Sequence, residues 1–466
     1  MKPIHSSILL AGVILMPALL PAATYSVFSG QSIQAKIDVA TNGDTVAIFG
    51  GSYTENLTVA NKDVRLQLVA GQTVTLAGNI TFSGLSNAYT FANFTWGGQT
   101  DKRITVNNCS NFTINGIKSP AGSIVSSNTP TLLINAVGLT NGGIYVTNSA
   151  STRIIDTSVS SAMDFVAGTK AQIIRSTNGG GLAANSQVDF IRSTVNGNYV
   201  STGTKLPDNA TPSRLSFTRC TVTEILDSTS GLTYVSYSTL RFFRQRSNGQ
   251  AYLVGNTINE RNAQGDQTVR AWDSALIVAF NNIVRDGNQN WGDNWAFYIN
   301  SAARLLALNN VIYSYSGNYN DRVFGLEGSN TNYISCNIAY AIQDNFIWAP
   351  FANNTVTYNL SQTGDENGVL VQNRLNADPA FVNTTDFVLG PTSPARNAGD
   401  PDPRFNDIDG TRNDMGIYGG PFYDPEGRTG SKPVVMQMEL DQTQFLRGDY
   451  STLKLKAVGS ATGTAP

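Results

Sequence analysis

The sequence of 466 residues contains a single histidine, His5, and only 14% of its residues are charged. His5 lies in a leader-like segment, in which Lys2 precedes an apolar run over residues 8–20. Such a segment is typical of a secretory signal peptide, so we expect residues 1–23 to be removed. The remaining chain then has no histidine, which excludes Ser-His-Asp and Cys-His nucleophile systems and the usual zinc sites.

Charge and cysteine are also scarce. The 31 Lys and Arg residues are balanced by 33 Asp and Glu residues, so no excess of cations exists to neutralise phosphates, and a nucleic-acid partner is disfavoured. The apolar run is shorter than the roughly 20 residues of a transmembrane helix. We therefore expect no membrane span in the mature chain. The leader predicts that the protein is secreted or held at the cell surface, and we expect it to be a monomer. The cysteines are too far apart for a Cys-x-x-Cys site and are expected to be separate buried thiols: Cys109, Cys220 and Cys336.

Short apolar segments recur along the chain, and each ends at a small or polar residue. The first four cover residues 132–136, 153–157, 172–176 and 189–193, and later ones end at Cys220, Ser238, Asn256, Asn282, Asn310, Asn337 and Asn359. The segments lack the apolar spacing of a helical repeat, and their steps are shorter than the roughly 40–50 residues of a propeller blade. The pattern predicts an all-β fold, a single-stranded right-handed parallel β-helix in which equivalent strands of successive coils bond to one another.

Two columns of like residues support this arrangement. One contains hydroxyl residues and the other asparagines: Ser158, Thr177, Thr194, Thr221, Thr239 and Thr257, and Asn256, Asn282, Asn310, Asn337 and Asn359. Stacked hydroxyls and amides can bond to their copies in neighbouring coils, which explains a small polar residue at each bend. Arg175, Arg192 and Arg219 also occupy equivalent positions. They predict either a cationic stripe for an acidic glycan or cations neutralised by Asp156 and Asp189.

The first coil begins with a predicted cap. Ser32 is a good N-cap for a short helix over residues 33–40, whose apolar residues lie on one face. A capping helix covers the apolar end of the coils and blocks edge-to-edge pairing. This helix, Gly-Asp-Thr-Val at 43–46 and Gly-Ser-Tyr-Thr-Glu at 51–55 resemble the opening of secreted proteins of the pectate-lyase-like right-handed parallel β-helix superfamily.

The far end of the chain strengthens the resemblance. Asp-Pro-Ala-Phe-Val at 378–382 and Asp-Met-Gly-Ile-Tyr-Gly-Gly at 414–420 are similar to the closing segment of many bacterial β-helix-repeat proteins. We expect a cap and first coil over residues 24–60 and the β-helix with its closing segment over 61–421. In residues 432–466, apolar and polar residues alternate as in β-strands. These strands are expected either to be added to the β-helix or to form part of an immunoglobulin-like sandwich. The superfamily includes lyases, hydrolases, esterases and non-enzymatic surface proteins, so the resemblance implies architecture rather than one chemistry.

Long loops indicate where a ligand would bind, because the interior of a β-helix is filled with side chains. The long steps lie between Ser193 and Cys220 and between Asn256 and Asn337, and the second contains three of the five tryptophans. Aromatic rings stack on sugars, while Arg and Asp bond to hydroxyls and carboxylates. We expect a polysaccharide in a groove there, an acidic one if the arginines bind its carboxylates, although packing of the loops on one another is an equal alternative. The predicted substrate-binding residues are Trp272, Trp291, Trp295, Arg244 and Arg246.

Without histidine, two chemistries of polysaccharide cleavage remain. In β-elimination, an arginine removes the proton beside a uronate carboxylate, whose charge is neutralised by calcium or another cation. In hydrolysis, two carboxylates stand about 5–9.5 Å apart. We favour β-elimination and predict Arg261, Arg270, Asp273 and Arg285 as catalytic residues. The predicted calcium ligands are Asp266, Asp286 and Asp293.

Two motifs of known β-helix enzymes are absent from the sequence. The Gly-His-Gly element of polygalacturonases needs a histidine, and the Arg-x-Pro-x-x-Arg element of pectate lyases does not occur. A polysaccharide lyase or glycoside hydrolase therefore competes with a non-catalytic cell-surface or adhesive β-helix. The groove separates these alternatives, because an enzyme needs arginines and carboxylates that converge there, whereas a rod needs only packed aromatic rings.

Overall fold

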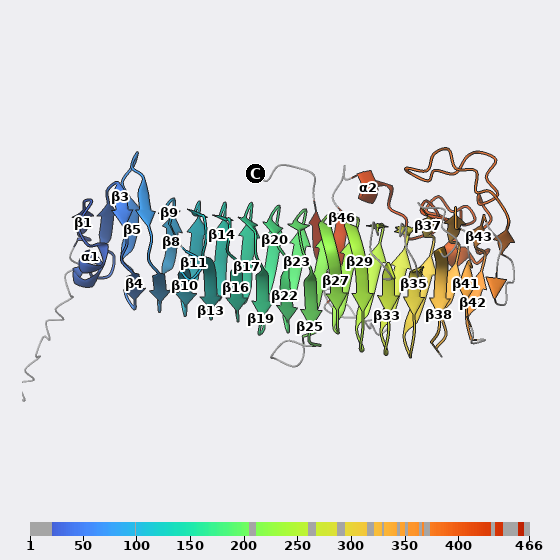
Figure 1. The fold of residues 1–466 in the computed structure, drawn as a ribbon, viewed down its shortest axis with the longest axis horizontal. Coiled ribbons are helices and arrows are strands. Elements are labelled where there is room, and N and C mark those ends of the chain that lie inside the picture. Colours follow the sequence, from blue (N-terminus) through green and yellow to red (C-terminus); the bar gives the residue numbers. More distant parts are fainter. Residues whose placement is uncertain are drawn as a thin grey trace, which may run out of the picture.

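The computed structural model shows one elongated spiral of strands, which runs from the cap at the blue end to the last coils at the orange end (Figure 1). The described residues are 21–97, 99–204, 211–259, 267–286, 294–314, 321–328, 330–342, 345–349, 353–362, 366–367, 373–429, 434–440 and 455–460. Equivalent strands of successive coils pair in parallel, so the predicted all-β fold, a parallel β-helix, is confirmed.

Three ladders of strands form the faces of the spiral. The first ladder includes β7 (Ile80–Ser83), β10 (Arg103–Asn107), β13 (Ser123–Ser127), β16 (Ile144–Thr147), β19 (Met163–Val166), β22 (Gly181–Ala184), β25 (Tyr199–Thr202), β32 (Val269–Ala271), β35 (Asn294–Ile299), β38 (Asp321–Leu326) and β41 (Ile347–Trp348). The second ladder consists of β8 (Ala88–Ala92), β11 (Asn111–Asn115), β14 (Thr131–Asn135), β17 (Ser151–Ile155), β20 (Lys170–Ile174), β23 (Gln187–Ile191), β26 (Arg214–Thr218), β28 (Leu232–Ser236), β30 (Gln250–Val254), β33 (Leu276–Phe280), β36 (Arg304–Leu308), β39 (Tyr333–Ser335) and β42 (Thr355–Thr357).

The third ladder is made of shorter strands. It includes β12 (Lys118–Ser119), β15 (Gly138–Leu139), β18 (Ser158–Val159), β21 (Thr177–Asn178), β24 (Thr194–Val195), β31 (Thr257–Asn259), β34 (Ile283–Asp286), β37 (Val311–Ser314), β40 (Ile338–Tyr340) and β43 (Leu360–Ser361). Two longer strands, β27 (Thr221–Ser228) and β29 (Thr239–Gln245), continue from the third ladder into the first. These two strands lie where the first long loop step ends.

The predicted cap is present as α1 (Ile33–Val39), whose buried residues Ile33 and Ile37 close the apolar end of the spiral. Ser32 is its N-cap and accepts a hydrogen bond from the amide of Ala35 at 3.0 Å. The carboxylate of Glu55 accepts hydrogen bonds from the amides of Ile33 at 2.6 Å and Gln34 at 3.1 Å. Glu55 therefore supplies acceptors for first-turn amides that have no partner within the helix.

Side chains alternate between the interior and the outer face along each strand, as the two-residue period of a strand requires. In β16, Ile144 and Val146 are buried, whereas Tyr145 and Thr147 are half-exposed. Stacked rings fill much of the interior: Phe82, Tyr89, Phe91, Phe94 and Phe112 near the cap, and Phe190, Tyr199 and Phe217 further along. A ligand can therefore bind only on an outer face or between coils.

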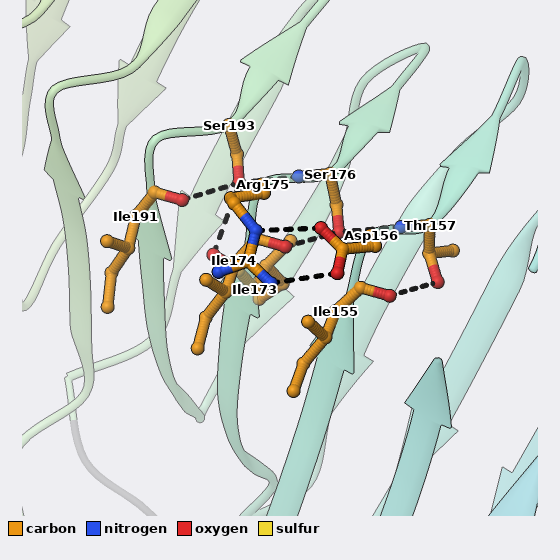
Figure 2. Close-up of polar contacts among 9 residues, drawn as sticks. All are labelled: Ile155, Asp156, Thr157, Ile173, Ile174, Arg175, Ser176, Ile191 and Ser193. Atoms are coloured by element: carbon orange, nitrogen blue, oxygen red, sulfur yellow. Dashed lines mark hydrogen bonds and ion pairs between the residues drawn. The ribbon is translucent and has the colours of Figure 1, made fainter. Parts of the chain in front are cut away.

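The predicted asparagine column is a continuous buried ladder of hydrogen bonds. The backbone amide of each asparagine donates to the side-chain oxygen of the equivalent residue one coil later, for example from Asn282 to Asn310 and from Asn310 to Asn337 at 3.0 and 2.9 Å. Each side-chain amide also donates to a carbonyl oxygen of the preceding coil, as Asn310 does to Ala279 at 2.9 Å. In earlier coils, Ser176 and Ser193 accept the equivalent amide bonds (Figure 2).

The predicted hydroxyl column also exists, since Ser158, Thr177, Thr194, Thr221, Thr239 and Thr257 follow one another in register. The same column then becomes aliphatic, with Ile283, Val311, Ile338 and Leu360 at the next four positions. These four residues are buried in a second core together with Phe387, Leu389, Ala395, Ala398, Met415 and Ile417. The column therefore changes where residues of the closing segment cover the outer side of the third ladder.

The closing segment runs back along the spiral from its last coils. Phe387 contacts Tyr313, Gly416 donates its amide to the carbonyl of Cys336 at 2.8 Å, and Asn281 donates its side-chain amide to the carbonyl of Gly419 at 2.8 Å. The segment then enters α2 (Pro425–Thr429), which lies beside earlier coils (Figure 1). Residues at the bend between the second and third ladders thus bind this returning segment.

The two strands expected in residues 432–466 are β46 (Val434–Leu440) and β47 (Leu455–Ser460). They pair antiparallel in a separate sheet, with Val434 opposite Ser460 and Leu440 opposite Leu455. The turn predicted between them lies outside the described residues. Cys109, Cys220 and Cys336 are buried free thiols, as expected. In the described part of the chain, no helix has the length and hydropathy needed to cross a membrane.

The asparagine ladder predicts a large effect of a small truncation. Replacing Asn310 by Ala removes the acceptor of the buried Asn282 amide, which is left unpaired, and also removes a hydrogen bond to the carbonyl of Ala279. We expect the free energy of unfolding to fall by about 2–4 kcal/mol. Thr239→Ala on the exposed hydroxyl column is the control and should change it by less than about 0.5 kcal/mol. Urea unfolding of both variants tests this, and equal midpoints would contradict the role of the ladder.

A second prediction concerns the closing segment, which packs on the aliphatic residues that continue the register of the hydroxyl column. Ile338→Asp places a charge in the core shared with Met415 and Ile417, which should release the segment from the coils. Limited trypsin digestion should then cut after Arg396, Arg404 or Arg412 much faster than in the unaltered protein. Thr194→Asp occupies the same column in an uncovered coil and should leave the digestion pattern unchanged. Equal cleavage rates in the two variants would contradict this interpretation.

Candidate functional site

The strongest candidate for a site is the outer face of the first ladder from β27 to β41. Successive positions there hold Asp227, Arg244, Arg270, Tyr298, Gly325 and Trp348, each paired in register with the next. Three further residues come directly after the ends of β29, β32 and β38, and these are Arg246, Trp272 and Glu327. We call these nine residues the arginine–aromatic face. Three residues that the sequence predicted to bind substrate, Arg244, Arg246 and Trp272, and one predicted catalytic residue, Arg270, therefore lie together.

Arg270 lies at the centre of this face and is surrounded by rings. Its guanidinium carbon is 4.7 Å from the centroid of the Trp272 ring and 5.5 Å from that of the Tyr298 ring. Its Nε is buried and has no hydrogen-bond partner among the described residues. Arg244 is its direct neighbour on the adjacent strand, so two cations of like sign occupy paired positions about 4.8 Å apart along the spiral.

Arg246 is tied to a carboxylate on the same face. Its Nε lies 3.1 Å from Oδ1 of Asp227, and its Nη2 contacts the other carboxylate oxygen, so the pair is bidentate. Its guanidinium carbon is also 5.3 Å from the ring centroid of Trp272, which therefore has two arginines as neighbours. The carboxylate of Asp227 is nearly buried, and this pairing satisfies both of its oxygens.

Tyr298 and Glu327 form a second polar pair. The Tyr298 hydroxyl donates a hydrogen bond to the Glu327 carboxylate at 2.6 Å. Burial, and then this bond, raise the pKa of Tyr298, so the hydroxyl stays protonated at neutral pH. Gly325 provides room beside the ring, because a Cβ there would lie 3.0 Å from Cδ2 of Tyr298 and 2.8 Å from Cδ2 of Trp295.

The tryptophans differ in exposure, and this separates packing from recognition. Trp295 is only 3% exposed, with Arg322 over its ring at 5.1 Å, so its side chain packs against β38 instead of offering a face to a sugar. Trp348 is 39% exposed and lies on the same line as Arg270, three coils further along. Sequence reasoning missed Trp348 and Tyr298, although both follow the first-ladder register once the coils are aligned.

Two other predicted catalytic residues lie apart from Arg270. Asp273 adopts a left-handed conformation with φ of 60° at the turn after β32, and its carboxylate accepts a hydrogen bond from the amide of Ser247 at 3.2 Å. Asp tolerates this conformation well, so the turn itself explains the residue. Arg285 is on β34 in the third ladder, where its guanidinium carbon is 5.9 Å from the ring centroid of Phe387 in the closing segment.

The remaining predicted residues cannot be placed on this face. Arg261, Asp266, Trp291 and Asp293 lie outside the described residues, as does the side chain of Asp286, the last residue of β34. Among the residues that are described, no group of three His, Cys, Asp or Glu side chains is arranged to hold a metal ion. A calcium site built from Asp266, Asp286 and Asp293 therefore stays a prediction.

The predicted arginine stripe lies at a different bend, between the second and third ladders. Figure 2 shows Arg175 reaching the carboxylate of Asp156 one coil earlier, with Nε–Oδ1 and Nη2–Oδ2 distances of 2.7 and 2.8 Å. Burial, and then the nearby Arg192, lower the pKa of Arg219. Asp189 pairs with Arg214 instead of with the stripe, at 2.7 Å. At least the first arginine of the stripe is therefore neutralised by the chain itself.

The packing of Gly325 generates a prediction for this face. Gly325→Ala should push the rings of Trp295 and Tyr298 apart and lower the free energy of unfolding by about 1–3 kcal/mol. Gly138→Ala on β15 is a matched control, because a Cβ there meets nothing within 4 Å. That variant should be neutral or stabilising by up to about 1 kcal/mol. Thermal unfolding followed by tryptophan fluorescence distinguishes them, and an unchanged Gly325→Ala variant would show that the rings can move freely.

Comparison of the sequence with models of known protein families and with curated proteins gave no match. The chemistry of the site therefore has to be inferred from the residues on the arginine–aromatic face.

Proposed function

We propose that this chain is a secreted or cell-surface β-helix protein that binds an acidic polysaccharide along the arginine–aromatic face. The observation that supports this most directly is Arg270. Its neighbour in register is another arginine, its two closest rings are Trp272 and Tyr298, and no hydrogen bond from its guanidinium is found within the described residues. An anionic group at this position would receive a charge-assisted bidentate hydrogen bond.

The shape of the face suits a linear polymer. Its residues follow one another along the spiral axis, so neighbouring subsites are separated by one coil, about 4.8 Å. The arginine end, with Arg244 and Arg270, is suited to carboxylate or sulfate groups. The other end offers the rings of Tyr298 and Trp348, with Gly325 between them in register, and rings of this kind stack on the apolar faces of sugars.

Cleavage by β-elimination is the reaction that we propose for a uronate bound there. Arg270, in its neutral form, would take the proton beside the carboxylate and become a guanidinium, and the released electron pair would form the carbon–carbon double bond as the glycosidic oxygen leaves. The leaving oxygen would gain its proton from this guanidinium or from water. Calcium would neutralise the uronate carboxylate if Asp266, Asp286 and Asp293 hold it. A place in the pectate-lyase-like superfamily is part of the same proposal, and the parallel coils, the cap helix and the returning closing segment support it.

Binding can be tested with Arg270→Met, which keeps an apolar stem but removes the charge. We expect the affinity for polygalacturonate or alginate to fall at least about tenfold, and its dependence on salt to weaken. Arg153→Met is the matched control, because Arg153 is exposed on the second ladder and makes no polar contact within the described structure. Isothermal titration calorimetry with both polymers and a neutral glucan measures the effect. Equal affinity of the two variants would reject this face as the site.

Cleavage is tested separately, by following the absorbance of unsaturated product from the same uronate polymers with and without calcium. The unaltered protein should form product, and Arg270→Met should form none. If the unaltered protein binds the polymers but forms no product in either condition, the elimination step is wrong and the non-catalytic alternative holds.

A further inference from the structure

A cavity lies near the cap, far along the spiral from the arginine–aromatic face. It occurs where the ladder of strands is interrupted. β5 (Arg65–Leu68) pairs with β2 (Thr45–Ile48) in a small sheet that also contains β1 (Thr24–Val27), whereas β8 begins the second ladder. Within residues 21–97, all of which are described, no backbone hydrogen bond joins β5 to β8. A pocket of about 640 Å³ occupies this interruption, a volume typical of small-ligand sites.

The backbone groups that face the pocket can be identified from the pairing on the far sides of the two strands. Successive amides of a strand point alternately to its two neighbours. Asn93 donates its amide to Asn115 on the β11 side, so the amides and carbonyls of Ala88, Thr90 and Ala92 face β5. By the same reasoning, Arg65 donates to Asp44 on the β2 side, and Leu68 faces β8. Both strand edges thus present backbone donors and acceptors to the pocket.

Tyr89 closes the inner side of the interruption. Its ring is stacked on Phe112 in the interior, and its hydroxyl accepts a hydrogen bond from the amide of Leu66 at 3.1 Å while donating to the carbonyl of Val64 at 2.9 Å. Burial raises the pKa of Tyr89, so the hydroxyl remains protonated and both bonds persist. The side chain therefore holds the two strands at a fixed separation and leaves the outer part of the gap open.

The lining of the pocket is polar and balanced in charge. It carries one carboxylate, Asp63, one guanidinium, Arg65, and the side-chain amides of Asn42, Gln67, Asn87 and Asn93. Asn87 donates to Oδ2 of Asp63, but Oδ1 of Asp63 is buried and accepts no hydrogen bond from any described residue. The pocket thus offers many donors and acceptors, one unused carboxylate oxygen and no excess of charge.

We propose that this pocket binds an uncharged saccharide unit, whose hydroxyls bond to Asp63, to the amide side chains and to the exposed edges of β5 and β8. Hydroxyls donate and accept, so they match a surface of amides and carbonyls, whereas an anionic sugar would meet Asp63. An added peptide strand is less suitable, because it needs about 4.8 Å on each side and the Leu66 amide that Tyr89 already occupies.

The test fills the pocket without touching the core. Thr90 is exposed on β8 and lines the pocket, so Thr90→Tyr should block it. Thr113 is its partner in register on β11 and lies outside the pocket, so Thr113→Tyr is the matched control. With maltotriose, cellotriose and galactotriose as probes, calorimetry should show at least about tenfold weaker binding for Thr90→Tyr, and no more than about twofold change for Thr113→Tyr.

Other outcomes overturn the proposal. If the unaltered protein binds none of the three trisaccharides at millimolar concentration, or if both variants bind equally well, the pocket is not a saccharide site. Binding of an extended Thr-Val hexapeptide but of no trisaccharide would assign the pocket to a peptide instead. Arg270→Met should leave trisaccharide binding unchanged. If it abolishes that binding while Thr90→Tyr does not, the sugar occupies the arginine–aromatic face, and only the pocket proposal is overturned.

Discussion

The structure depends on how buried backbone amides are satisfied at the bend between the second and third ladders. At this bend the chain turns through a residue of positive φ, such as Asn281 or Asn309, and the next amide points along the spiral axis toward the following coil. An unpaired buried amide is expensive, so each coil needs a side-chain acceptor at one position. Ser176, Ser193 and Asn282 meet this need, and each thereby fixes the register of the coil before it.

The change from hydroxyl acceptors to asparagine follows from the same requirement. A serine oxygen accepts the amide of the preceding coil and can donate only one further hydrogen bond. Asparagine accepts that amide and also donates to a carbonyl one coil earlier, as Asn282 does to Leu253 at 2.8 Å. Ser193 also donates to a carbonyl one coil earlier, that of Ile173, but asparagine has a second amide proton, which Asn282 donates to the side-chain oxygen of Asn310. Coils joined by asparagine are therefore linked by one more hydrogen bond. They are the coils on which the closing segment packs and near which the long loops leave the spiral.

Sequence reasoning predicted the coils well because stacking makes like residues recur at equivalent positions, and recurrence is visible in one sequence. It predicted the closing segment only by resemblance, although the replacement of Thr257 by Ile283 and Val311 in one column already shows which coils are covered. The site was harder to predict. Loop length pointed to the coils that carry most of the arginine–aromatic face. It could not separate Trp295, which is buried, from Trp348, which is exposed, because exposure depends on how each side chain packs in the folded coils.

Asp273 and Arg285 each have a structural explanation that residue type alone does not reveal. Asp273 is explained by the conformation of its turn, and Arg285 by its contact with the closing segment, so neither needs a ligand. Arg270 has no comparable explanation. Arginines at paired positions on neighbouring strands, such as Arg244 and Arg270, repel one another. Asp227 is engaged with Arg246, and the rings around Arg270 offset only part of its charge. The anionic ligand that we propose would offset the part of the Arg270 charge that these rings leave.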